Sequence, residues 1–494
     1  MTQPNEVPRP QIGWLLGLLL LTNLVGVDGA RGSEAGLLDD PRDEEFFGDD
    51  TTDDSPPTQP AQPSQPEGDK SLDDLLLGEG SGQESADLTG RLLSELTTEK
   101  LQIGGMVYLR LSASQAQEER GPVVASPNLL DLFLDARPND RTRAYARGRL
   151  VYTPLSSTMV PGVTPEAEET RALLDQLFVH FDVGRWMFLT VGKQPVRWGT
   201  SRLWNPVDGI NASKKDPLAF FDERTGVPMV KAHLPIEPLG LNAIGLLMLQ
   251  GDGRWDELGA ALRLEKPLGT AEVGLSGVLT ERSDPLTLPQ LLAGTSADRH
   301  REYQLGLDLS AGVWDLDLTA EAALTFLQDE GSLRRELFKT NGWDALVQAT
   351  LGASYTLKYD ASEYIVFGAE YFYNRNGLEH KSGYLEAIAT GSASPFYLGR
   401  HYAALYILLP MPGNWNNTSF TLSNIGNLSD GSGLTRFDMR TDILTWVKLE
   451  AYLSGNWGTK GGEFRFGMEE IPFVPDSSLP YPLLQGGVNL RMDL

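Results

Sequence analysis

The side chains of this chain that could carry chemistry are carboxylates, arginines and five histidines, because the sequence contains no cysteine. A chain without cysteine has no disulfide framework, no thiolate metal site and no thiol nucleophile. No two histidines stand at zinc-binding spacing. His180 and Asp182 share one face of an alternating segment, but they would serve a hydrolase only if a serine met them from elsewhere. We therefore predict no enzyme, no cofactor and no metal site, with a serine lipase or protease as the minor alternative.

Two sets of charged residues recur at alternate positions, so that each set shares one face of a strand. The basic set is Arg110, Arg143, Arg147 and Arg149. The acidic set is Asp308, Asp315, Asp317 and Glu321. Opposed basic and acidic walls across a pore would orient polar solutes and disfavour apolar ones. A wet inner surface without selectivity explains the same pattern equally well, and it explains the acidic face better than a divalent-cation site does.

The segment from Lys193 to Gly226 combines aromatic residues with charges of both signs. It joins two expected strands through some thirty residues, and connections of this length are usually functional or disordered. Its aromatic side chains need burial. We expect it to fold into the interior of a barrel and form a constriction, and a loop packed on the rim is the even alternative. The constriction residues expected from this segment are Lys193, Arg197, Trp198 and Asp208.

Strands must position these residues, because the dominant period from Lys100 onward is two. From Trp314 to Phe326, apolar residues occupy one set of alternate positions and polar ones the other. A helix of this sequence would spread its acids around the whole circumference, whereas a strand separates them. We expect the preceding strand to join this one through a two-residue turn at Ala311-Gly312. The chain also ends in alternation, from Val488 to Leu494.

The pattern predicts an all-β fold, a transmembrane antiparallel β-barrel of about 16–18 strands over residues 99–494. A hydrophobic fraction of 41% fits such a barrel, because lipid-facing and lumen-facing residues alternate along each strand. Aromatic residues near strand ends would form interfacial girdles. The expected girdle residues are Trp186, Trp314, Trp343, Tyr355, Tyr359, Tyr371, Tyr373, Tyr402 and Tyr406. A soluble β-sandwich or propeller is the alternative, but we find no repeat of blade length.

The N-terminal part of the chain has a different composition. Residues 1–30 place Arg9 before an apolar run and end in small residues, which is typical of a secretory signal peptide. Residues 31–98 form an acidic arm rich in Pro, Gln and Ser, with room for one short helix. From Glu34 to Asp87 we count seventeen acidic residues against two basic ones. Such a composition predicts disorder, and the acidity of the chain argues against nucleic acid as a partner.

The sequence resembles outer-membrane β-barrels of Gram-negative bacteria. Within it, Gly192-Lys193-Gln194, Trp198-Gly199 and Asn205-Pro206-Val207-Asp208 resemble a segment of poorly characterised proteobacterial barrels and, more loosely, of alginate-export barrels. The resemblance implies a porin-like or export-type channel, and a last strand read by the barrel insertion machinery. It departs from the pattern in Lys193, where arginine is usual, and in Leu494, where Phe or Trp is usual.

We therefore expect an outer-membrane channel that transports polar solutes or exports a polymer or lipid-like cargo. The alternative is a surface structural or adhesion protein that uses a plugged barrel as its mount. The expected partners are outer-membrane lipid, the insertion machinery through the C-terminal strand, and periplasmic transport partners.

Overall fold

The structure of the protein is a computed structural model. It describes residues 100–117, 121–154, 169–184, 186–211, 216–220, 224–250, 258–283, 299–327, 345–360, 363–390, 394–467 and 480–494. The signal peptide and the acidic arm expected in residues 1–98 lie outside the described residues. Among the described residues, no helix is long and apolar enough to cross a membrane.

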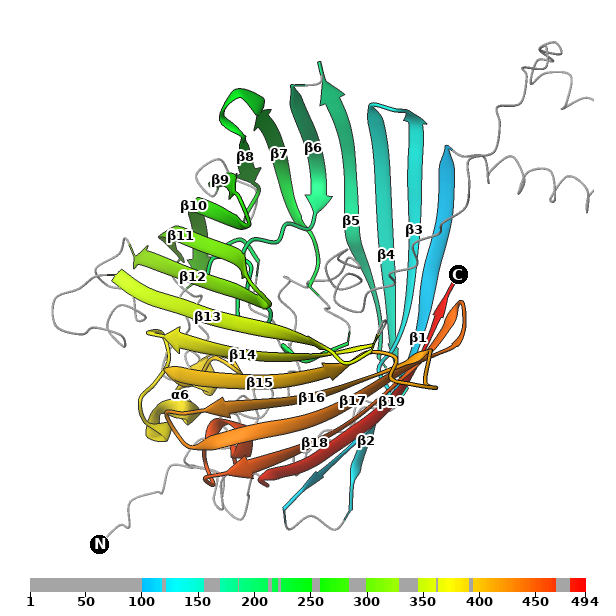
Figure 1. Ribbon diagram of the computed structural model, residues 1–494, viewed down its shortest axis with the longest axis vertical. Coiled ribbons are helices and arrows are strands. Elements are labelled where there is room, and N and C mark those ends of the chain that lie inside the picture. The colour runs from blue at the N-terminus through cyan, green and yellow to red at the C-terminus, as the bar shows by residue number, and fades with distance from the viewer. Residues whose placement is uncertain are drawn as a thin grey trace, which may run out of the picture.

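Eighteen strands of the described chain form one closed antiparallel ring (Figure 1). Each strand pairs with the next along the chain, and β19 returns to pair with β1. The strands are β1 (Leu101–Ala116), β3 (Asn128–Asn139), β4 (Thr142–Thr153), β5 (Glu169–Val183), β6 (Met187–Gln194), β7 (Val227–Ile236), β8 (Leu241–Met248), β9 (Gly259–Leu268), β10 (Ala271–Ser283), β11 (Arg299–Val313), β12 (Leu316–Leu327), β13 (Ala345–Lys358), β14 (Tyr364–Asn374), β15 (His401–Leu409), β16 (Thr418–Asn427), β17 (Ser432–Leu444), β18 (Val447–Gly458) and β19 (Pro482–Asp493). The barrel predicted from the alternation is confirmed.

A few short elements complete the fold. The three-residue strand β2 (Val123–Ala125) precedes β3 and pairs with the same strand, β1. The helical pieces are η2 (Glu237–Leu239), η4 (Lys381–Gly383), α6 (Tyr384–Thr390) and η5 (Glu463–Arg465). One irregularity bears on the inner wall: the register of β4 against β5 shifts between Arg147 and Gly148, which leaves Asp175 as an extra, buried residue in β5.

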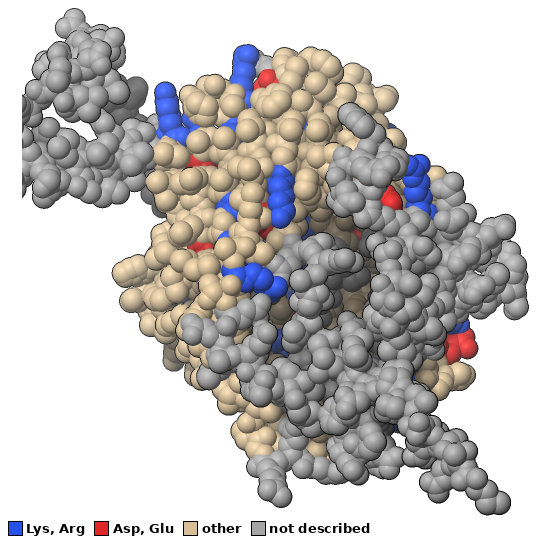
Figure 2. Space-filling view, turned by 180° about the vertical axis from the view of Figure 1, so that it is seen from behind, with Lys and Arg blue, Asp and Glu red and all other residues tan. Residues whose placement is uncertain are grey.

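The alternation places apolar side chains outside and polar ones inside. Outward-facing leucines are widely exposed around the ring, for example Leu132 at 49%, Leu351 at 62% and Leu453 at 57%. On the outer face of the described strands, Asp, Glu, Lys and Arg lie near strand ends, and Lys193 is the penultimate residue of β6, where it pairs with Leu177 of β5. Figure 2 shows one side of the molecule from behind, and its described surface is mostly tan, with few charged atoms. This outer surface is that of a membrane-spanning barrel.

The two ends of the barrel differ in their connections. At one end the strands join through short turns, such as Gly269-Thr270 between β9 and β10 and residues 445–446 between β17 and β18. At the other end most connections are long, and the longest described one is the segment between β6 and β7. Strongly exposed aromatic residues lie in the short turns: Trp186, Trp314, Tyr359, Trp415 and Trp446. Outward aromatic residues near the other end of their strands are Tyr152, Tyr303, Phe326, Tyr371 and Trp457.

Two details of the predicted barrel are wrong. The turn between β11 and β12 is Trp314-Asp315 rather than Ala311-Gly312, because Ala311 and Gly312 extend the ladder opposite Leu318 and Asp317. Trp314 adopts the left-handed backbone that this turn requires, with φ of 58°. Tyr402 and Tyr406 do not belong to a girdle, because both are buried on the inner face of β15.

Candidate functional site

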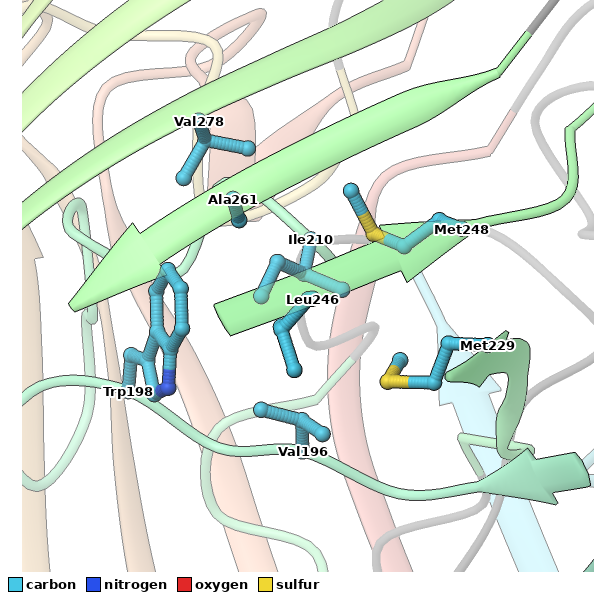
Figure 3. Packing of buried hydrophobic residues seen from close by; sticks show 8 residues of the cluster. All are labelled: Val196, Trp198, Ile210, Met229, Leu246, Met248, Ala261 and Val278. Carbon is cyan, nitrogen blue, oxygen red and sulfur yellow. The ribbon is translucent and has the colours of Figure 1, made fainter. Parts of the chain in front are cut away.

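The described residues between β6 and β7, which are 195–211, 216–220 and 224–226, pack against the inner wall of the barrel, and we call them the inner loop. Its first contact is an apolar cluster in which Val196, Trp198 and Ile210 meet inward residues of β7 to β10 (Figure 3). The wall residues of this cluster are Met229, Leu246, Met248, Ala261 and Val278. An apolar patch on the inner face of a barrel is unusual, because inward positions are normally wet. The inner loop covers this patch.

A second apolar contact lies farther around the ring. The side chain of Trp204 is fully buried, and its ring stacks on Phe372 of β14 at 5.4 Å and contacts Tyr402 of β15 at 5.6 Å. Its indole nitrogen donates to the carbonyl of Phe396 at 3.2 Å. Burying such a ring contributes a few kcal/mol, on the order of 2–3 by area. The inner loop therefore spans the wall from β7 to β15.

Between these contacts, two wall carboxylates bind the backbone of the inner loop. Glu321 of β12 accepts from the backbone N–H groups of Thr200 and Ser201, each at 2.6 Å, and of Val207 at 3.4 Å. Glu370 of β14 accepts from the next three N–H groups, of residues 202, 203 and 204, at 3.1, 3.2 and 2.9 Å. Five consecutive N–H groups thus point at two buried carboxylates, 3% and 4% exposed. Such charge-assisted bonds are stronger than neutral ones, so this stretch of the loop is fixed to the wall.

The remainder of the inner loop has further attachments. Asp216 accepts from the guanidinium of Arg436 on β17 at 3.1 Å, and that guanidinium lies over the ring of Phe220. Within the loop, Asp208 accepts from Asn211 and from Arg224 at 3.4 Å. Burial raises the pKa of the Asp208 carboxyl, although Arg224 opposes the shift.

The predicted arginine column faces inward, but the structure neutralises it locally. Arg147 and Arg149 share two carboxylates: Arg147 lies 2.6 Å from Asp131 of β3, and Arg149 lies 3.1 Å from Asp175, the extra residue of β5. Arg143 donates to Asp135 at 2.8 Å. Arg110 donates to the carbonyl of Pro127 at 2.5 Å and lies over the ring of Tyr108. These four arginines therefore belong to one inner face, and Arg143, Arg147 and Arg149 have acids beside them rather than across the barrel.

The predicted acidic wall is divided among different roles. Asp308 makes a bidentate pair with Arg263 of β9, at 2.7 and 2.8 Å. Glu321 lies beneath the inner loop and not on a wet face. Asp317 is exposed and faces inward, as predicted. Asp315 lies in the turn that follows β11, so it is not part of a wall.

Three of the expected constriction residues lie on the inner loop, and one does not. Trp198 is buried, the side chain of Asp208 is buried as well, and Arg197, which directly precedes Trp198, is exposed. Lys193 faces outward, because it pairs with Leu177, an outward residue of β5 that is 51% exposed. Its ammonium group donates to the carbonyl of Leu174 at 2.7 Å. The prediction for Lys193 was wrong because the inner loop leaves the wall only after Gln194, so Lys193 still obeys the alternation of β6.

His180 and Asp182 share one face of β5, as the alternation predicted, and that face points inward. The ring of His180 contacts the hydroxyl of Thr190 at 3.0 Å and not a serine. The described residues also hold no cluster of three or more His, Cys, Asp or Glu that could bind a metal ion.

Sequence reasoning missed the partners of the arginines and the second carboxylate of the inner loop. Asp131 and Asp135 could have been found, because they alternate with the leucines of 130–134 in the same period of two. Asp175 breaks that period as a bulge, and Glu370 looks like any inward polar residue of a strand. Nothing in the sequence around Glu370 indicates that it binds a loop 166 residues earlier.

No protein-family model matches this chain, and no curated protein matches it. Among solved structures it is similar to Acinetobacter baumannii OccAB1, with 7% identity and a TM-score of 0.45 over 80% of this chain and 97% of the other. Pseudomonas putida OprB is similar at 12% identity and a TM-score of 0.42, over 82% and 97% of the two chains. A porin of Rhodopseudomonas blastica is similar at 13% and 0.37, over 80% and 100%.

Proposed function

We propose that the protein is an outer-membrane channel for small polar solutes, narrowed by its inner loop. The observation that carries this proposal is the attachment of the inner loop, through Glu321 and Glu370, to the inside of a closed barrel. A loop fixed there reduces the free cross-section. An inner wall of paired charges leaves a polar path, and such walls set which solutes pass.

The outer face supports the membrane location. Val313 lies ten positions after Tyr303 on β11. At about 3.3 Å per residue and a tilt of about 40°, such a stretch spans roughly 25 Å, the height of the apolar band of outer-membrane barrels. Aromatic residues flank the leucines at both ends, as interfacial girdles do. The short turns then face the periplasm and the long connections face outward, in the usual orientation of these barrels.

The same geometry suggests how the barrel reaches the membrane. Outward residues of β19, among them Leu484, Val488 and Leu490, alternate with inward ones along the strand. This strand pairs with β1 and closes the barrel. We propose that this strand is read by the insertion machinery. Export of a polymer or lipid-like cargo with periplasmic partners is a second candidate function. No contact among the described residues favours export over diffusion of small solutes.

Conductance tests the proposal. The purified protein, folded in detergent, is inserted into planar bilayers and compared with a variant in which residues 198–221 are replaced by a short Gly/Ser turn. We expect discrete conductance steps for the protein and larger steps for the variant. Each protein must first migrate differently before and after boiling, as folded barrels do. A folded protein that conducts in neither form would contradict the channel and favour a plugged barrel that serves as a surface mount.

A further inference from the structure

A row of polar and basic residues crosses four adjacent strands on the inner wall. Arg143, His180, Thr190 and Lys231 are direct cross-strand partners on β4, β5, β6 and β7. Partners of this kind lie about 5 Å apart. All four face inward, since Thr190 contacts His180 and Lys231 shares its face with Met229 of the apolar cluster. We call these four residues the basic row.

The cations of the basic row differ from the other inner cations. Arg147, Arg263 and Arg436 are each paired with a carboxylate at 2.6 to 2.7 Å. Lys231 makes no ion pair within the described part of the chain. The surrounding wall shields its ammonium group from water. Arg143 shares Asp135 with Arg137 and remains 40% exposed, so two cations meet one carboxylate there.

The charges that face the basic row leave it positive. Asp135 already pairs with two guanidinium groups, those of Arg137 and Arg143. Asp182 is the next inward residue after His180 on β5. Arg137, Arg143 and Lys231 thus face two carboxylates on this wall. A buried or half-buried cation without a partner favours an anion from solution, because its own desolvation is then offset.

Aromatic rings border the basic row on both sides. Toward the short turns, Phe188 lies between His180, parallel at 6.2 Å, and His233, at 5.8 Å. On the other side, Tyr145 and Phe178 stack at 5.3 Å beneath the guanidinium of Arg143. Inward positions two residues apart on a strand lie about 7 Å apart, roughly the length of a benzoate ion. Flat rings and cations at this spacing suit a ligand with a ring and a carboxylate.

We propose that the basic row is a binding site for small aromatic carboxylates inside the barrel. The carboxylate lies between Lys231 and Arg143, accepts from Thr190 or His180, and the ring packs against Phe188. This inference rests on the proposed function, since it names a solute class that the channel would select. The apolar cluster beneath the inner loop bounds the site on one side, because its member Met229 is the inward residue that precedes Lys231 on β7.

Binding in detergent tests the site without relying on conduction. Folded protein is titrated calorimetrically with sodium benzoate, benzamide and sodium acetate. We expect saturable binding of benzoate that exceeds binding of benzamide and of acetate at least tenfold. Lys231→Gln should weaken benzoate binding about tenfold or more, which is the effect of losing about 1.4 kcal/mol of electrostatic attraction. Phe188→Leu should weaken benzoate binding and leave acetate unchanged.

Lys448→Gln is the matched control, because it removes an inward lysine of β18 on another part of the wall. It should keep benzoate affinity within twofold, and every variant must show the heat-dependent mobility of a folded barrel. Absence of benzoate binding, equal binding of benzamide, or full affinity in Lys231→Gln would each overturn the site. Benzoate binding by a protein that does not conduct would support the site and refute the channel. Conductance without benzoate binding would support the channel and refute the binding site.

Discussion

The carboxylates that bind the inner loop provide the most direct test of the proposal that this loop narrows the barrel. In Glu321→Ala, three buried N–H groups lose an acceptor whose two shortest bonds are 2.6 Å long. Charge-assisted bonds contribute about 1.5–3 kcal/mol each, so the loss is on the order of 3–6 kcal/mol when only the short bonds count fully. Glu370→Ala removes a comparable set.

After these substitutions, the apolar contacts of the loop still stabilise its attachment to the wall. Trp198 and Trp204, 3% and 0% exposed, contribute about 2–3 kcal/mol each by burial. Either single variant therefore keeps the loop on the wall most of the time and adds brief openings. In the double variant Glu321→Ala/Glu370→Ala, the two rings contribute about 4–6 kcal/mol together, which is no more than the entropy cost of ordering the five residues 200–204 at about 1–2 kcal/mol each, so we expect the loop to detach.

Single-channel recording distinguishes these cases. We expect flickering between two levels in each single variant, and in the double variant a steady level that approaches that of the loop replacement. Asp317→Asn is the control, because it removes one negative charge from the same inward face of β12 without touching the loop backbone. If Asp317→Asn raised conductance as much as the double variant, the effect would be one of charge, and the assignment of the two carboxylates as loop anchors would be refuted.

Further predictions concern stability and pH. Arg147→Met leaves Asp131 and Asp175 with Arg149 alone, so the free energy of unfolding in lipid vesicles, measured in urea, should fall by about 3 kcal/mol; a loss below about 1 kcal/mol would contradict a structural ion-pair network. Trp204→Ala should cost about 3–5 kcal/mol in the same assay, and the exposed Trp415→Ala should cost little. Burial raises the pKa of Glu463 in η5 from 4.5 to about 7, which disfavours its charged form in the folded state. This group therefore stabilises least at high pH, and its contribution is lost as pH rises from about 4.5 through about 7. The melting temperature should fall between pH 5 and pH 8 by more in the native protein than in Glu463→Gln, and an equal fall in both would exclude this carboxyl as the cause.

Alternation predicted the barrel well, because each strand repeats the same rule independently of its neighbours. The inward direction of Arg143 and Arg149 and the outward direction of Leu305 and Leu351 follow from that period alone. Register is harder to predict, as the β11–β12 turn shows. Three further pairs, formed by residues 311–313, keep the same alternation and shift the turn by three residues.

The candidate site was less predictable, because it depends on contacts between residues far apart in sequence. The length and aromatic content of the inner loop indicated that it needs an apolar surface. The sequence offered no way to match Trp204 with Phe372, or Glu370 with three backbone N–H groups of a distant loop. Lys193 misled for the opposite reason: it lies next to the loop in sequence, but the strand rule still governs it.

The closure of the ring has a consequence for the order in which the chain folds. The seam between β1 and β19 includes the bond from Asn489 to the hydroxyl of Tyr108, which joins residues 381 positions apart. The bond from Trp204 to Glu370 joins residues only 166 apart. The difference in loop-closure entropy is small, about 0.7 kcal/mol, but it favours docking of the inner loop before the seam forms. The last strand then closes the barrel around an inner loop that is already docked. A chain that stopped before this strand paired would be an open curved sheet with two unpaired edges, and its wall with the docked loop would face the periplasm.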